Sequence, residues 1–136
     1  MHCRDHAVQL HRAKNDLEAG GEVVLIGQAT PRHAAHFRRR LELDWPVLAD
    51  KDRGSYRAAG AKVATMGELF GPEVVAKGVV AAQRSGQVQG RTIGHAAQLG
   101  GVLVVRPDGT VAWSHMSDNA ADNASPEDIA AALTAA

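Results

Sequence analysis

The chain has 136 residues, a length that supports one compact domain with its own apolar core. Fifteen basic residues balance fifteen acidic ones, so no net charge draws the protein to nucleic acid or to an anionic membrane, and we expect neither as a partner. A single cysteine excludes an internal disulfide and no signal peptide or apolar membrane-length segment is present, so we expect a cytoplasmic protein with a free thiol.

The first predicted element is an amphipathic helix over residues 3–18 that ends at two glycines, residues 20–21. Its apolar residues recur at three- and four-residue multiples and form one face: Cys3, Ala7, Leu10 and Leu17. Charged residues occupy the rest of the helix. The pattern indicates a helix that packs one face against a core.

The only cysteine, Cys3, lies in the first turn of this predicted helix. Unpaired backbone N–H groups in a first turn favour the thiolate over the thiol, and Arg4 and a protonated His2 or His6 would strengthen the effect. These residues predict a thiol placed for redox chemistry. The opposing interpretation is that Cys3 is a small apolar residue packed in the core.

Four short elements are predicted next along the chain. Residues 23–26 form an unbroken apolar run, which is typical of a strand buried on both faces in a helix-covered sheet. Thr30 and Pro31 predict the N-cap and first residue of a helix. Residues 45–50 predict a brief strand, and residues 55–59 predict a short helix that carries Tyr56 inward.

The segment from about residue 60 to residue 100 has weak periodicity and spaced glycines, and we expect a mobile insertion there, with a helix over 72–84. Residues 101–106 and 110–115 predict an antiparallel hairpin around a Pro-Asp-Gly turn. Ser125 predicts the N-cap of a C-terminal helix, followed by a proline and a capping-box acid. The order of elements predicts an α/β fold with a mixed sheet covered by helices.

Other groups of residues in the sequence do not predict a metal, cofactor or phosphate site. His2, Cys3 and His6 are zinc- or copper-binding residue types, but the sequence places no fourth ligand beside them, so we predict no metal site. No nucleotide-binding motif is present, and we expect no cofactor. The run of arginines at residues 38–40 is interpreted as a solvated helix face rather than a phosphate site.

Several segments occur in an order and spacing that resemble a known family. They are a helix beginning Cys3-Arg4-Asp5-His6, an apolar strand ending near glycine, a Thr-Pro helix, the strand from Pro46 to Asp50 and the hairpin region from Gln98 to Gly109. Over nearly its whole length the chain resembles the peroxiredoxin-like, AhpC/TSA-type branch of the thioredoxin superfamily. The resemblance implies a single thioredoxin-like domain over residues 1–136. Its three layers would hold a mixed central sheet flanked by helices, with a C-terminal β-hairpin plus helix.

The chain also departs from the family. The resemblance implies a Cys-x-x-Cys motif delivered by a central strand to the start of the first long helix, and Cys3 matches its second cysteine. The first cysteine would fall directly before Met1, and the N-terminal strand is missing. We expect the reading frame to continue upstream with an apolar strand that ends in cysteine; the alternative is a member that has lost both. The Pro-x-x-x-Thr-x-x-Cys pattern of typical peroxiredoxins is absent, and Arg91 is a conceivable counterpart of their later arginine.

The resemblance implies a thiol-dependent oxidoreductase that reduces peroxides or disulfides with electrons from a thiol donor, with Cys3 and Arg4 as catalytic residues. In an upstream-extended chain, the first cysteine would attack the substrate and Cys3 would resolve the product. In the 136-residue chain, Cys3 would act alone. The alternative from another class is a non-catalytic thioredoxin-like binding module with a packed Cys3. The oligomeric state stays open.

Overall fold

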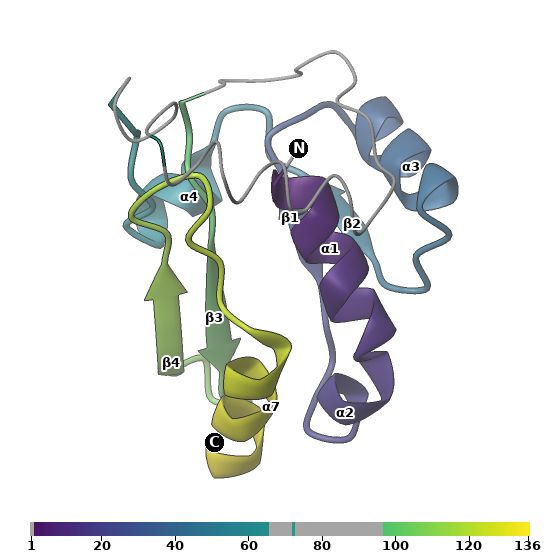
Figure 1. The fold of residues 1–136 in the computed structure, drawn as a ribbon, viewed down its shortest axis with the longest axis vertical. Coiled ribbons are helices and arrows are strands. Elements are labelled where there is room, and N and C mark those ends of the chain that lie inside the picture. The colour runs from purple at the N-terminus through teal and green to yellow at the C-terminus, as the bar shows by residue number, and fades with distance from the viewer. Residues whose placement is uncertain (1, 66–71, 73–96) are drawn as a thin grey trace.

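The computed structural model describes residues 2–65, 72 and 97–136, and it begins with two short helices (Figure 1). These are α1 (His2–Arg12) and α2 (Lys14–Glu18). The single helix expected over 3–18 is therefore interrupted at Ala13, whose backbone leaves the helical region with φ −95° and ψ 18°. The backbone N–H groups of Gly20 and Gly21 both donate to the carbonyl of Leu17 and end the helical segment, as predicted.

A parallel pair of strands follows, β1 (Leu25–Gly27) and β2 (Val47–Ala49), joined by α3 (Pro31–Arg40). Thr30 is the N-cap of α3, because its Oγ1 accepts a hydrogen bond from the backbone N–H of His33 at 3.4 Å. Pro31 is the first helical residue, which confirms the prediction from the Thr-Pro pair. The short helix α4 (Gly54–Ala58) comes after β2 and carries Tyr56, which is half-buried.

The antiparallel hairpin is confirmed, with strands β3 (Gly101–Val105) and β4 (Val111–Met116). Gly109 in its turn has φ 87°, a left-handed conformation that glycine adopts without strain. The C-terminal helix is α7 (Pro126–Ala135). Its predicted cap is also confirmed, since Ser125 Oγ accepts a hydrogen bond from the backbone N–H of Asp128 at 3.1 Å.

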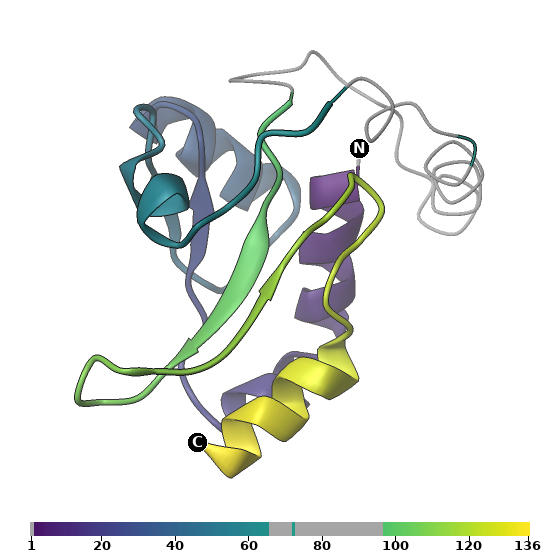
Figure 2. The same cartoon turned by 90° about the vertical axis from the view of Figure 1, so that its left-hand side faces the viewer.

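Within the described residues the strands form two separate two-stranded sheets, where the sequence predicts one mixed sheet. The two sheets nevertheless share one core, because Leu25 of β1 and Val102 of β3 pack against the same buried cluster. That cluster consists of Leu10, Leu17, Trp45, Ala124 and Ile129. Figure 2 shows the helices that supply most of it, α1, α2 and α7, on one side of the strands.

The other face of both sheets is only partly covered in the described part of the chain. Ile26 of β1 is 47% exposed and Leu103 of β3 is 40% exposed. Successive strand side chains point to opposite faces, so Leu25 and Val102 reach the helices while their neighbours point away. The expectation that residues 23–26 are covered on both faces is therefore wrong for the described structure.

The predicted insertion at about residues 60–100, including the helix over 72–84, lies largely outside the described residues. Its two described ends meet in an antiparallel bridge between Val63 and Gln98. The backbone N–H of Ala64 donates to the carbonyl of Ala97 at 2.7 Å, and that of Leu99 to the carbonyl of Lys62 at 2.9 Å. Among the helices of the described part, none has the length and apolar character needed to cross a membrane.

Candidate active site

The predicted thiol, Cys3, is exposed in the first turn of α1. Arg4 beside it is half-buried, and Asp5 is buried, with 4% of its surface exposed. Figure 1 shows this turn at the same end of the molecule as the carboxyl ends of β1 and β2. The exposure of Cys3 differs from the packed alternative and leaves its sulfur open to a substrate.

His6 faces the loop that precedes α7. Its Nε2 lies 2.9 Å from the carbonyl oxygen of Ala124, and because a carbonyl only accepts, Nε2 carries the proton. Burial lowers the pKa of His6, the hydrogen bond to Ala124 opposes this shift, and His115 lowers the pKa further. His6 is therefore neutral at about pH 7. Burial therefore disfavours the protonated form of His6 that would add positive charge beside Cys3.

The loop between β4 and α7 is held by a histidine and a carboxylate. His115 Nε2 lies 3.0 Å from Asp122 Oδ1, and the backbone N–H of Asp118 donates to Asp122 Oδ2 at 2.8 Å. The bond from His6 to Ala124 attaches the same loop to α1. These contacts fix the loop next to the helix that carries Cys3.

Asp50 follows β2 and caps α4. Its backbone N–H donates to the carbonyl of Gly27 at 2.8 Å, which joins it to the end of β1. Its carboxylate accepts from the backbone N–H groups of Gly54 at 3.1 Å and Ser55 at 2.8 Å, and from the Ser55 hydroxyl. The hydrogen bond from the Ser55 side chain is the main cause that lowers the pKa of Asp50. These hydrogen bonds hold the first turn of α4, which carries Tyr56, the residue after Ser55.

Tyr56 reaches from α4 to β1, where its hydroxyl donates to the carbonyl of Ile26 at 2.9 Å. Burial raises the pKa of Tyr56, and the negative charges of Cys3 and Asp50 raise it further, while a backbone hydrogen bond from Gln28 lowers it. The phenol thus lies within the electric field of the Cys3 thiolate. The sequence predicts that Tyr56 points inward, but no spacing pattern signals its link to residue 3.

This link gives a testable titration. Tyr56 is the only tyrosine, so the ultraviolet absorbance of tyrosinate follows this one group. We expect a midpoint above that of the urea-unfolded chain, because burial opposes ionisation. Cys3→Ser should lower the midpoint, since it removes a negative charge that opposes formation of the phenolate. Equal midpoints for the folded and unfolded chains would contradict the described environment of Tyr56.

A buried amide lies at the bridge beside α4. Gln98, with 8% of its surface exposed, donates from Nε2 to the carbonyls of Lys62 at 3.1 Å and Leu99 at 3.0 Å. Its Oε1 accepts from Arg53 Nη1 at 3.3 Å. Arg91, the conceivable counterpart of the peroxiredoxin arginine, lies outside the described residues. In the described ranges no three histidine, cysteine, aspartate or glutamate side chains are grouped to hold a metal ion.

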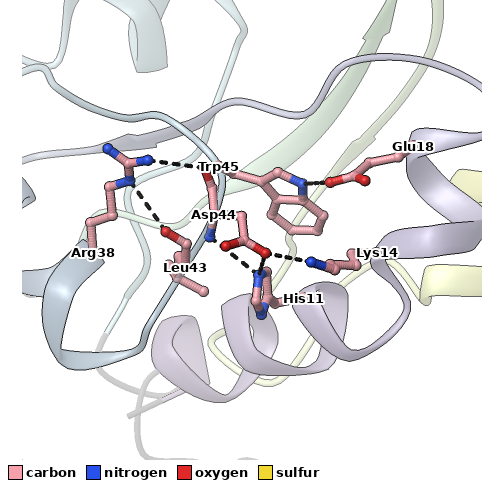
Figure 3. Close-up of polar contacts among 7 residues, drawn as sticks. All are labelled: His11, Lys14, Glu18, Arg38, Leu43, Asp44 and Trp45. Atoms are coloured by element: carbon pink, nitrogen blue, oxygen red, sulfur yellow. Dashed lines mark hydrogen bonds and ion pairs between the residues drawn. The ribbon is translucent and has the colours of Figure 1, made fainter.

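A second polar cluster lies at the other end of α1 from Cys3 (Figure 3). The carboxylate of Asp44 pairs with Lys14 and lies 3.3 Å from His11 Nε2, and Trp45 Nε1 donates to Glu18 at 2.7 Å. The hydrogen bond from Lys14 lowers the pKa of Asp44, and it raises the pKa of Lys14 itself. Because these groups satisfy one another, the cluster joins α1 and α2 to the segment before β2 and is structural.

Comparison with known proteins gives one match. The family model described as AhpC/TSA antioxidant enzyme matches residues 9–119. No curated protein and no solved structure matches the chain. The matched range includes both strand pairs, α3 and α4, and it begins after Cys3 and Arg4. The match confirms the resemblance seen in the sequence, and the chain belongs to the peroxiredoxin-like AhpC/TSA family of the thioredoxin superfamily.

Proposed function

We propose that this protein is a thiol-dependent oxidoreductase that reduces peroxides or disulfides at Cys3, with electrons from a thiol donor. The supporting observation is an exposed cysteine in the first turn of α1 in a chain of the AhpC/TSA family. The positive end of a helix dipole stabilises a nearby negative charge. Because His6 is neutral, Arg4 supplies the cationic side chain next to Cys3. A free thiol of this kind suits a reducing compartment, and we propose the cytoplasm.

With a hydroperoxide, the Cys3 thiolate attacks one peroxide oxygen. A sulfur–oxygen bond forms, the oxygen–oxygen bond breaks, and the leaving oxygen takes a proton from water and departs as an alcohol or water. Cys3 is then a sulfenic acid. An external thiol attacks its sulfur, water leaves, and a second thiol releases Cys3 from the resulting mixed disulfide. With a disulfide substrate, the thiolate attacks one sulfur, the substrate disulfide bond breaks, and the other sulfur leaves as a thiolate, so that Cys3 is held in a mixed disulfide. In a chain with a cysteine directly before Met1, that cysteine attacks first and Cys3 resolves the product.

We also propose that the two sheets are outer parts of one mixed sheet in a three-layer thioredoxin-like fold. In that sheet, one further strand would lie between β1 and β3. The carbonyl of Gly27 accepts from Asp50 after β2, so by alternation the N–H and carbonyl of Ile26 point away from β2. The Ile26 carbonyl accepts from the Tyr56 hydroxyl, and its second lone pair can accept from a strand. The carbonyl of Gly100 accepts from Ser117 after β4, so the corresponding groups of Leu103 point away from β4. One strand could pair with both edges, parallel to β1 and antiparallel to β3.

The redox proposal is tested by peroxide consumption with dithiothreitol as the thiol donor. We expect consumption by the wild-type protein and its complete loss in Cys3→Ser. The matched control is the double variant Cys3→Ser, Gln9→Cys, which moves the only thiol to another exposed position of α1. This variant should stay well below wild type, because residue 9 lies beyond the first turn, where the helix dipole acts. Equal rates in wild type and Cys3→Ser would favour the non-catalytic binding module.

A further inference from the structure

Helix α3 carries a stripe of basic side chains on one exposed face. Arg32, His36, Arg39 and Arg40 are all exposed, and their spacing of four, seven and eight residues from Arg32 places them on the same side of a helix. Ala34, on the other side, is buried. The sequence of α3 contains no acidic residue that could neutralise the stripe.

The arginines of this stripe are available to a partner. Within the described part of the chain, the side chains of Arg32, Arg39 and Arg40 have no hydrogen-bond or ion-pair partner. Arg38 differs, because its Nε donates to the carbonyl of Leu43 at 3.2 Å and its Nη2 to the carbonyl of Asp44 at 3.0 Å (Figure 3). The run at residues 38–40 therefore divides into one structural arginine and two that face solvent.

The spacing of the stripe fits a polypeptide that carries carboxylates. Residues four apart on a helix are about 6 Å apart along its axis, so carboxylates at the same spacing on a partner helix could face the stripe in register. The chain as a whole has no net charge, so an acidic partner is attracted to this face rather than to the whole molecule. Charge complementarity thus selects a partner with an acidic surface.

The stripe begins at the end of the molecule that carries the thiol. The first turn of α1 and the start of α3 lie toward the same end of the molecule in both views (Figures 1 and 2). We propose that the stripe of α3 is the docking surface for the protein thiol donor that reduces Cys3, and that this donor is acidic next to its thiol. This inference rests on the proposed redox role of Cys3 and adds the chemical class of its partner.

The test uses thiol exchange, which needs no other oxidant. Cys3 is first converted to its mixed disulfide with thionitrobenzoate. A peptide thiolate then attacks the Cys3 sulfur, a new disulfide forms, and coloured thionitrobenzoate leaves. Three peptides are compared, each with one cysteine, a flexible spacer and a run of glutamate, glutamine or lysine. We expect the glutamate peptide to react at least about threefold faster than the glutamine peptide at low ionic strength, and the difference to vanish at high salt.

Two charge-reversal variants locate the effect. Arg39→Glu with Arg40→Glu should abolish the preference for glutamate. Arg12→Glu with Arg106→Glu changes the net charge equally at exposed positions outside α3, and it should retain the preference. Fast but equal release by all peptides, or equal loss in both variants, would overturn the docking surface alone. Slow release by every peptide would contradict the reactivity of Cys3, and the docking proposal with it. Stronger binding of a single-stranded oligonucleotide than of the glutamate peptide to the same arginines would overturn the choice of partner.

Discussion

Replacing Gly20 by alanine is expected to destabilise the fold by about 1–2 kcal/mol and to lower the Tm by roughly 3–8 °C. Gly20 follows α2 and contacts α7, and a Cβ added there would lie 2.7 Å from the Cβ of Leu133. The Leu133 Cβ is fixed to the helix backbone, whose carbonyl carbon and Cα lie 3.6 and 3.7 Å from the added atom. No rotamer change relieves this contact, so α7 must move away from α2 and lose apolar packing.

The matched control is Gly54→Ala. No heavy atom lies within 4 Å of a Cβ added to Gly54, which is the first residue of α4. Alanine at this position should leave stability unchanged or raise it by up to about 1 kcal/mol, because it reduces the freedom of the unfolded chain. Thermal unfolding followed by circular dichroism compares the variants. An unchanged Tm in Gly20→Ala would contradict the described packing of α7 on the end of α2.

A chain extended ahead of α1 by a short apolar strand that ends in cysteine is expected to melt several degrees above the 136-residue chain. Such a strand would run parallel to β1 and lead directly into α1, forming the right-handed crossover that parallel strands favour. Even about 1–2 kcal/mol of stabilisation from the added burial would raise the Tm by several degrees. The N–H groups of Ile26 and Leu103 should also exchange more slowly, because they point toward the proposed place of the strand.

The control for this prediction is an extension of equal length, built from glycine and serine and ending in the same cysteine. It supplies the second thiol without apolar side chains, so it should leave both the Tm and the exchange rates unchanged. If the apolar extension also left both unchanged, the proposal that β1 and β3 flank the place of a strand would be wrong.

Local chemistry made part of this fold predictable. Thr30 and Ser125 cap their helices through backbone N–H groups only three residues away, so the sequence alone carries the signal. The Pro-Asp-Gly turn of the hairpin is equally local. Burial of the strands was not predictable in the same way. An apolar run such as residues 23–26 does not show which face other elements cover, and only the Leu25 side meets the helices.

In the candidate site, too, the features set by nearby residues were predictable from the sequence and those set by distant residues were not. The position of Cys3 in a first helical turn follows from residues close to it in sequence. The neutral state of His6 depends on burial, and the ring contacts the carbonyl of Ala124, which is 118 residues away in sequence. The position of Tyr56 likewise depends on a hydrogen bond to Ile26, which is 30 residues away in sequence. Such contacts have no sequence signature of their own.

The most direct test of the account is to trap the oxidised form of Cys3. The reduced protein is treated with hydrogen peroxide in the presence of dimedone, and the peptide that contains Cys3 is examined by mass spectrometry. We expect a dimedone adduct on Cys3 that increases with the peroxide dose, because the thiolate forms a sulfenic acid before any external thiol reacts. If Cys3 stays unlabelled and is afterwards fully alkylated by iodoacetamide as a free thiol, the proposed redox role of this cysteine is wrong.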